Sequence, residues 1–199
     1  MRCKVWRNLL TLALLAAVTA FATNPTWAQE AGLIGKPAPD FRLPDVLTGK
    51  DVRLSDLKDK VVVVIFYSHT CTFCRNYEAR FRQLAAEHAG KGVAVLAIDS
   101  TGRTAEEAGA AWKEKKMGFP LLRDDRARTA ATLGATAMTT VCIVDARGNL
   151  RYVGAFDDNE SGQEIRCRFV ADAVAALLAG KAIQHEQTDV YGCMIPLPK

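Results

Sequence analysis

Cys71 and Cys74 are separated by two residues, a spacing that lets two thiols close a small disulfide. They follow a short polar segment, Ser68-His69-Thr70, and before it seven consecutive apolar residues, 61–67. Most of that apolar run is β-branched, which predicts a strand buried on both faces, as in the middle of a parallel sheet. Apolar residues then recur at helical spacing, so a helix is expected to begin at the cysteine pair.

This order of elements predicts a reactive thiol. Cys71 falls at or just before a helix N-terminus, where unpaired N–H groups and the helix dipole favour an anion. Its pKa is therefore expected to lie below the ordinary value of about 8.5. Cys74 lies one turn further in and is less exposed, so we expect Cys71 to attack and Cys74 to resolve. A structural disulfide and half of a zinc site are the alternatives.

Residues 1–28 have the pattern of a signal peptide. Arg2, Lys4 and Arg7 precede an apolar run over 9–22, and Thr26-Trp27-Ala28 predicts cleavage after Ala28. The protein is then exported, periplasmic or extracellular, and an uncleaved leader would be its only membrane contact. Without the leader the formal charge falls from +4 to +1, because three basic residues leave with it. Nothing in this composition indicates nucleic-acid binding.

The mature chain would keep five cysteines: Cys71, Cys74, Cys142, Cys167 and Cys193. Cys142 lies in a predicted strand, where alternation favours burial as a small apolar residue. Cys167 lies near the expected start of the last helix and is predicted to be partly exposed. A Cys167–Cys193 disulfide would tie the tail down; alternatively, Cys193 folds back and resolves or relays the Cys71–Cys74 disulfide. Sequence alone does not decide the pairing.

The rest of the chain alternates strands and helices, with turn residues between them. A hairpin over 40–54 comes first, then the 61–67 strand, and a last amphipathic helix is expected over 163–178. The other predicted elements are a strand over 93–98, helices over 104–116 and 125–133, a short extended piece over 119–122, and a hairpin over 141–156. Thr104 with Glu107 is typical of a helix-opening capping box. Such an order requires crossovers and a sheet covered by helices on both faces, in one domain.

Four stretches carry a resemblance to a known family: Gly35 to Phe41, Leu54 to Val62, Cys71 to Cys74, and Val141 to Gly148. Together they resemble the redoxin branch (AhpC/TSA, peroxiredoxin-like) of the thioredoxin-like superfamily. The resemblance implies an α/β thioredoxin-like fold, with a central mixed sheet, helices on both faces and an N-terminal β-hairpin extension. It implies a thioredoxin-like (redoxin) domain over 29–180 and a C-terminal tail over 181–199.

Two departures from that family bear on the site. The thioredoxin fold usually has a cis-proline where Thr139 stands, so a trans or differently shaped loop is expected here. Peroxiredoxins place an arginine near this position, and Ser68 replaces their usual threonine, which weakens a peroxidase interpretation. His69, Thr139 and Cys193 are candidate accessory residues.

The predicted function is an exported thiol-disulfide oxidoreductase that uses the Cys71-x-x-Cys74 pair. The expected partners are a protein or small-molecule disulfide substrate and a redox partner that resets the pair, and no cofactor or metal is expected. One alternative is a peroxiredoxin-like thiol peroxidase with Cys71 as the peroxidatic cysteine and Cys74 or Cys193 resolving it. The other is a non-enzymatic copper- or zinc-binding module using Cys71, Cys74 and a histidine such as His185.

Overall fold

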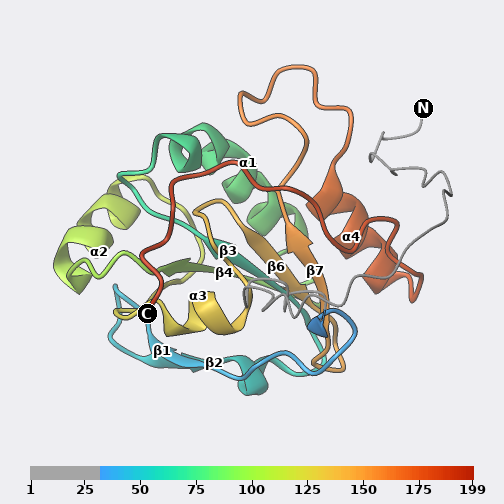
Figure 1. Cartoon of the computed structure of the whole chain (residues 1–199), viewed down its shortest axis with the longest axis horizontal. Helices are drawn as coiled ribbons and strands as arrows, with labels where there is room; N and C mark the ends of the chain where they lie inside the picture. Colours follow the sequence, from blue (N-terminus) through green and yellow to red (C-terminus); the bar gives the residue numbers. More distant parts are fainter. Residues whose placement is uncertain (1–31) are drawn as a thin grey trace, which may run out of the picture.

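The computed structural model describes residues 32–199, so the expected signal peptide and its cleavage site lie outside the described residues. The elements follow the predicted order (Figure 1). The strands are β1 (Arg42–Pro44), β2 (Asp51–Arg53), β3 (Val61–Phe66), β4 (Val93–Asp99), β5 (Leu121–Arg123), β6 (Val141–Val144) and β7 (Leu150–Gly154). The helices are a 3-10 turn (Leu54–Leu57), α1 (Thr72–His88), α2 (Ala105–Glu114), α3 (Arg128–Thr132) and α4 (Phe169–Leu178).

The main sheet is mixed and has the strand order β5-β4-β3-β6-β7. β3 lies at its centre, parallel to β4 and antiparallel to β6. All six residues of β3 are buried, which agrees with the prediction from its continuous apolar run. β1 and β2 pair as the separate N-terminal hairpin that the sequence predicts. The mixed sheet with its hairpin extension is the predicted α/β architecture.

Helices cover both faces of the main sheet. α1 and α4 lie side by side, since Leu84 of α1 and Ala171 of α4 line one cavity. Figure 1 shows α3 and the β1–β2 hairpin on the other side of the strands. α2 begins at Thr104, whose hydroxyl accepts from the Glu107 N–H in the predicted capping box.

Two helices begin later than the sequence predicts. α3 begins at Arg128 because Ala127 has a left-handed backbone (φ 49°) and the Asp124 carboxylate accepts from the N–H of Arg128. α4 begins at Phe169 because Glu164 has a positive φ of 51° and Asp158 accepts the N–H groups of residues 166 and 167. Both segments satisfy their backbone groups through an aspartate side chain, which competes with helix formation.

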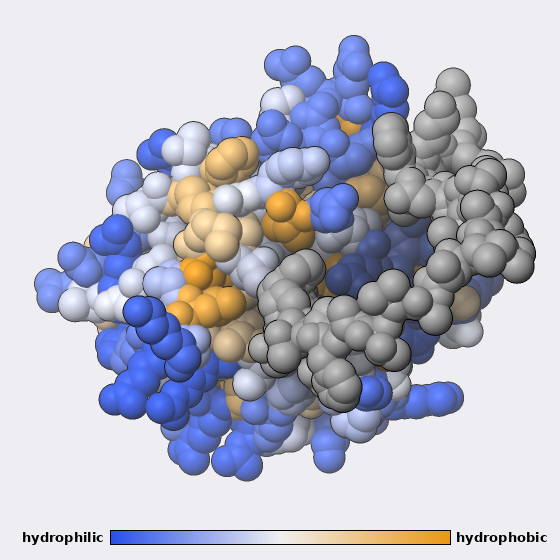
Figure 2. Space-filling model, in the orientation of Figure 1, coloured by the Kyte–Doolittle hydropathy of each residue, from blue (hydrophilic) through white to orange (hydrophobic). Residues whose placement is uncertain are grey.

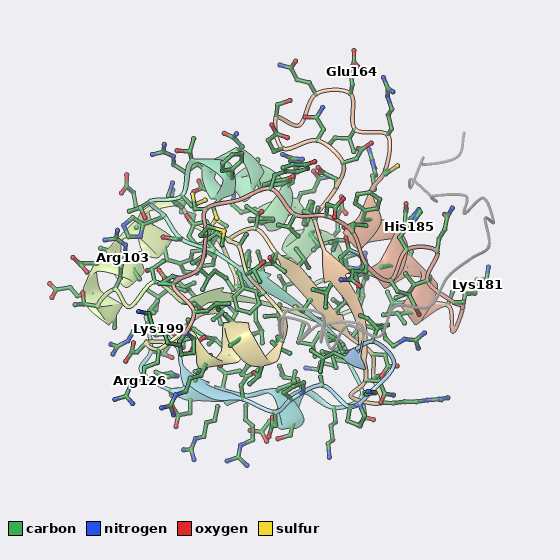
Figure 3. The ribbon with its side chains drawn as sticks, in the orientation of Figure 1. Arg103, Arg126, Glu164, Lys181, His185 and Lys199 are labelled. Atoms are coloured by element: carbon green, nitrogen blue, oxygen red, sulfur yellow. The ribbon has the colours of Figure 1, made fainter. Side chains whose placement is uncertain are left out.

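The C-terminal tail is bound to the domain along much of its length, although its sequence has little pattern. Residues 186–195 run across the carboxyl ends of the strands and past the start of α1 (Figure 1). Figure 3 shows Lys181 and Lys199 on opposite sides of the molecule, so the tail crosses this whole face. Isolated bridges join Gln187 to Val153 and Met194 to Ala137.

None of the helices in residues 32–199 is both long enough and apolar enough to cross a membrane.

Candidate active site

Cys71 caps the helix that follows the central strand. After Phe66 the chain makes a short turn, closed by the bond from the Cys71 N–H to the Ser68 carbonyl (3.1 Å). Cys71 is the N-cap of α1 with an extended backbone (φ −79°, ψ 119°), and no side chain caps the helix. The orphan N–H groups of the first turn are therefore available to an anion at this position. Cys74, one turn in, accepts from the Ser68 N–H (3.5 Å).

The surroundings of the two thiols drive their pKa values apart. The Cys74 thiol interacts with the Cys71 sulfur and, with backbone N–H groups of residues 74 and 193, lowers the pKa of Cys71 to about 5 despite its burial. The same interaction, together with burial, raises the pKa of Cys74. At neutral pH Cys71 is therefore the thiolate and Cys74 the thiol. This is the polarity that the sequence predicts, because a backbone amide of the first helical turn contributes to it.

Both thiols are buried: Cys71 is 2% exposed and Cys74 is fully buried. Cys71 nevertheless lies at the mouth of the helix rather than within it, and tail residue Cys193 lies against it. The Cys193 thiol interacts with the Cys71 sulfur, and the N–H of Thr72 points to the Cys193 sulfur. Cys193 itself is exposed and free. The access of a substrate to Cys71 therefore depends on the tail.

The loop before β6 holds the tail in place. Met138 donates its N–H to the Cys193 carbonyl (2.8 Å), and Ile195 donates to the Thr136 carbonyl (2.9 Å). The Thr139 hydroxyl donates to the Tyr191 carbonyl (2.9 Å). Gly192 packs so closely that a Cβ there would lie 1.8 Å from the Met138 oxygen. The tail thus pairs with this loop through an isolated antiparallel bridge between Ala137 and Met194, and Cys193 precedes that bridge.

Thr139 occupies a strained backbone position beside the thiols. Its φ is 74°, in the left-handed region that β-branched residues avoid, and no cis peptide bond occurs among the described residues. The trans loop expected at Thr139 is therefore confirmed. The Thr139 N–H donates to the Phe66 carbonyl at the end of β3 (2.7 Å), which ties the loop to the same strand that positions Cys71.

His69 is half-buried in the turn before α1. The groups that lower the pKa of Cys71 are Cys74 and Cys193. The proposed help of His69 to the thiolate stays a prediction. Thr70, next to Cys71, receives a hydrogen bond from the Arg103 guanidinium (3.3 Å), which brings a cation to the rim of the site (Figure 3).

Cys142 and Cys167 lie away from this chemistry. Cys142 is fully buried in β6, as predicted, and burial raises its pKa to about 12. Cys167 is 6% exposed, so the prediction of partial exposure is wrong; it lies in the loop before α4, under the Asp158 carboxylate. Cys193 is free, so the alternative of a Cys167–Cys193 disulfide is wrong as well.

Within residues 32–199, no group of three or more His, Cys, Asp or Glu side chains could hold a metal ion. His185, the histidine considered for such a site, packs its ring edge-on against Phe169.

A groove of about 480 Å³ adjoins Thr139. Aromatic side chains of Tyr77, Phe169 and Tyr191 line it, and the carboxylates of residues 157, 158, 160 and 189 surround it. Arg80 fixes one wall, since it forms a buried ion pair with Asp157 and donates to the Glu160 carbonyl (2.7 Å). The groove offers an acidic, aromatic surface beside the Thr139 loop.

Sequence reasoning did not identify the residues that place the tail. Gly192 acts through close backbone packing and Tyr191 through its carbonyl, and no sequence motif predicts either contact. The one available signal was the pairing of a glycine with Cys193, since a glycine often marks a close approach of two backbones.

Comparisons with known proteins agree with this geometry. The model of a family described as the AhpC/TSA family matches residues 34–153. The thiol:disulfide interchange protein DsbE of Pseudomonas fluorescens biotype C is 29% identical, over 84% of this chain and 96% of its own. The thiol-disulfide oxidoreductase ResA of Bacillus thuringiensis (strain Al Hakam) is 31% identical, over 73% of this chain and 84% of its own.

Among solved structures, a hypothetical protein from Sinorhizobium meliloti 1021 is similar, with a TM-score of 0.75 and 31% identity. The match covers 83% of this chain and 94% of that one. The similarity extends beyond the family match, because it reaches more of the chain than residues 34–153.

Proposed function

Because this chain belongs to the AhpC/TSA family, with a thioredoxin-like fold, we propose that it is a thiol-disulfide oxidoreductase in which Cys71 attacks and Cys74 resolves. The observation that carries the proposal is the N-cap position of Cys71 on α1, where its pKa falls to about 5. A thiolate is the nucleophile in disulfide exchange. Cys74, protonated and one helical turn away, then serves as the resolving thiol.

The chemistry follows from these two sulfurs. The Cys71 thiolate attacks a substrate disulfide, forms a mixed disulfide and releases one substrate thiolate. Cys74 loses its proton and attacks the Cys71 sulfur, so that the Cys71–Cys74 disulfide forms and the second substrate thiolate leaves. Two electrons pass from the pair to the substrate, and a redox partner must return them. Exchange in the opposite direction oxidises a dithiol.

The groove beside Thr139 supports a polypeptide as the substrate class. Its aromatic lining and the carboxylates of residues 158, 160 and 189 favour an extended segment with basic side chains, because opposite charges steer and orient a partner. Binding there places a substrate segment against the Thr139 loop, next to the site. The leader pattern of residues 1–28 supports the proposal that the protein works after export, in the periplasm or outside the cell.

The test is the reduction of insulin disulfides by the purified protein with dithiothreitol as electron source. We expect Cys71→Ser to reduce the rate to the uncatalysed background, and Cys74→Ser to slow the reaction because the mixed disulfide at Cys71 loses its resolving thiol. Cys142→Ala is the matched control, because that thiol is buried in β6 away from the site, and it should keep wild-type activity. Wild-type protein that neither accelerates the reaction nor forms a Cys71–Cys74 disulfide would refute the proposal.

Peroxide reduction is not favoured by the geometry. A peroxidase holds the peroxide beside the thiolate with a cation, whereas the groups that lower the pKa of Cys71 are Cys74 and Cys193, and the Arg103 guanidinium bonds to Thr70 at the rim of the site.

A further inference from the structure

The tail brings a third cysteine to the reacting sulfur. Cys193 and Cys71 interact through their thiols, and each receives a backbone N–H from the other's segment: Cys193 N–H points to the Cys71 sulfur, and Thr72 N–H to the Cys193 sulfur. Backbone N–H groups at the start of α1 therefore interact with both sulfurs. Such reciprocal contacts bring together the two thiols that a disulfide exchange would join.

The backbone on both sides of Cys193 is fixed, so this contact does not rest on one side chain. The Cys193 carbonyl accepts from Met138, and Ile195 donates to Thr136 in a short antiparallel bridge. Upstream, the Thr188 hydroxyl accepts from the Ala155 N–H (2.9 Å). Gly192 fits against Met138 with no room for a Cβ. The tail is thus seated like an extended peptide whose cysteine faces the active-site thiol.

The three cysteines differ in solvent exposure. Cys71 and Cys74 are buried, so a disulfide between them offers little surface to an external thiol. Cys193 is exposed, and the neighbouring Tyr191 and Met194 are 71% and 78% exposed. Figure 2 shows apolar surface gathered along the path of the tail on this face. A partner could reach Cys193 without entering the site.

We propose that Cys193 is a third redox-active cysteine, which exchanges with the buried Cys71–Cys74 disulfide and carries it to the surface as a Cys71–Cys193 disulfide. This deepens the proposed function and rests on it. The Cys193 thiolate attacks the Cys71 sulfur, the Cys71–Cys193 bond forms and the Cys71–Cys74 bond breaks. Cys74 leaves as a thiolate and takes up a proton, which balances the proton lost by Cys193. No electrons are gained or lost, so no further oxidant is required.

Protonation states agree with this sequence. In the reduced protein the Cys71 thiolate raises the pKa of Cys193, so Cys193 stays a thiol. Once Cys71 is in a disulfide, that negative charge is gone and the Thr72 N–H still stabilises a Cys193 thiolate. Cys193 therefore becomes the better nucleophile only when there is a disulfide for it to attack.

The first test traps the exchanged species. Cys74→Ser protein is treated with oxidised glutathione, quenched in acid, alkylated and mapped by mass spectrometry. We expect a Cys71–Cys193 disulfide within the chain as the main product. Cys71 held as a glutathione mixed disulfide, with Cys193 still a thiol, would overturn the proposal.

The second test measures a rate. We expect the fully oxidised Cys193→Ser protein to react with dithiothreitol at least about tenfold more slowly than wild type, because only its buried disulfide is available. The Cys142→Ala control should stay within about twofold. An equal or faster rate in Cys193→Ser would show that the tail only covers the site and would overturn the relay. Failure of the proposed function looks different, since the wild-type protein would then form no Cys71–Cys74 disulfide at all.

Discussion

Cys71 is a thiolate because its neighbours donate to it, and that has a measurable pH signature. Its folded pKa of about 5 lies below the unfolded value of about 8.5, so the thiolate stabilises the reduced fold above the unfolded pKa. That stabilisation is lost as the pH falls through 5.

The rate of Cys71 alkylation by iodoacetamide should therefore reach half its maximum near pH 5. We expect Cys74→Ala to move this midpoint upward, since the Cys74 thiol makes the largest contribution to the lowered pKa. Mass spectrometry of the Cys71 peptide follows the reaction. A wild-type midpoint near the ordinary value of about 8.5 would contradict the assignment.

The same charge predicts a reduction potential. A stabilised thiolate favours the reduced form and makes the disulfide more oxidising. The pKa of about 5 lies between the values of about 7 for thioredoxin and about 3.5 for DsbA. Equilibration with glutathione buffers should therefore give a potential between about −270 and −120 mV. A potential more negative than that of thioredoxin would show that the stability of the Cys71 thiolate does not determine the potential of the pair.

Thr139 predicts that the family's proline would not fit here. Proline requires a φ near −65° and has no N–H, whereas residue 139 has a φ of 74° and donates to Phe66. We expect Thr139→Pro to lower the free energy of unfolding by about 3 kcal/mol or more. Urea unfolding checks this, with Thr139→Gly as a control that keeps the backbone angle accessible. Thr139→Pro protein as stable as wild type would contradict it.

At this scale the sequence predicted what depends on local spacing. The Cys71–Cys74 pair and its place at a helix start follow from four residues and the run before them. The Cys193 contact could be raised only as one alternative, because it depends on the path of residues 181–195, which have no periodic pattern.

At the scale of elements, α1 is fixed to the loop after β7 by Arg80. Its guanidinium pairs with the buried Asp157 carboxylate, lies 4.0 Å above the Tyr77 ring and donates to the Asn159 carbonyl (2.9 Å). The pKa of Asp157 is raised by burial and held down in part by Arg80. Removing the cation leaves an unpaired buried charge.

We expect Arg80→Leu to destabilise the protein by about 3–5 kcal/mol at pH 7. The effect should shrink at acidic pH, because a protonated Asp157 no longer needs the cation; a raised folded pKa favours the fold at low pH. Urea unfolding at pH 7 and pH 4.5 measures both. Gln83→Leu, at an exposed position of the same helix, is the control. An equal loss at the two pH values would exclude the ion pair as the cause.

Elements with strong periodicity were predicted well, and those with side-chain competition were not. β3 and α1 follow directly from the apolar run and the helical spacing after it. The predicted starts of α3 and α4 were wrong because Asp124 and Asp158 bond to backbone N–H groups further along the chain. That choice depends on tertiary placement, which the spacing of apolar residues does not report.

At the scale of the whole molecule, the tail makes access to Cys71 conditional on opening. Gly192 is the point where this can be tested, because any side chain there meets Met138. Reactivity of a covered group scales with the fraction of molecules that are open.

Gly192→Ala should therefore increase the alkylation rate of reduced Cys71 by about tenfold or more. Gly32→Ala is the matched control, since the nearest atom to a new Cβ there is the flexible Lys36 Nζ at 3.4 Å. Circular dichroism confirms that both variants remain folded. An unchanged rate in Gly192→Ala would mean that something other than the tail limits access.

The bridge between Ala137 and Met194 has one more consequence. While the tail is in place, it pairs with the Thr136 carbonyl and the Met138 N–H; when it lifts, these two groups lose their partners, and unpaired backbone groups of this kind can pair with another chain. Gly192→Ala protein, whose tail is displaced, is therefore expected to self-associate more than wild type in concentrated solution. The segment that carries Cys193 to the site also covers the backbone groups through which two copies could pair.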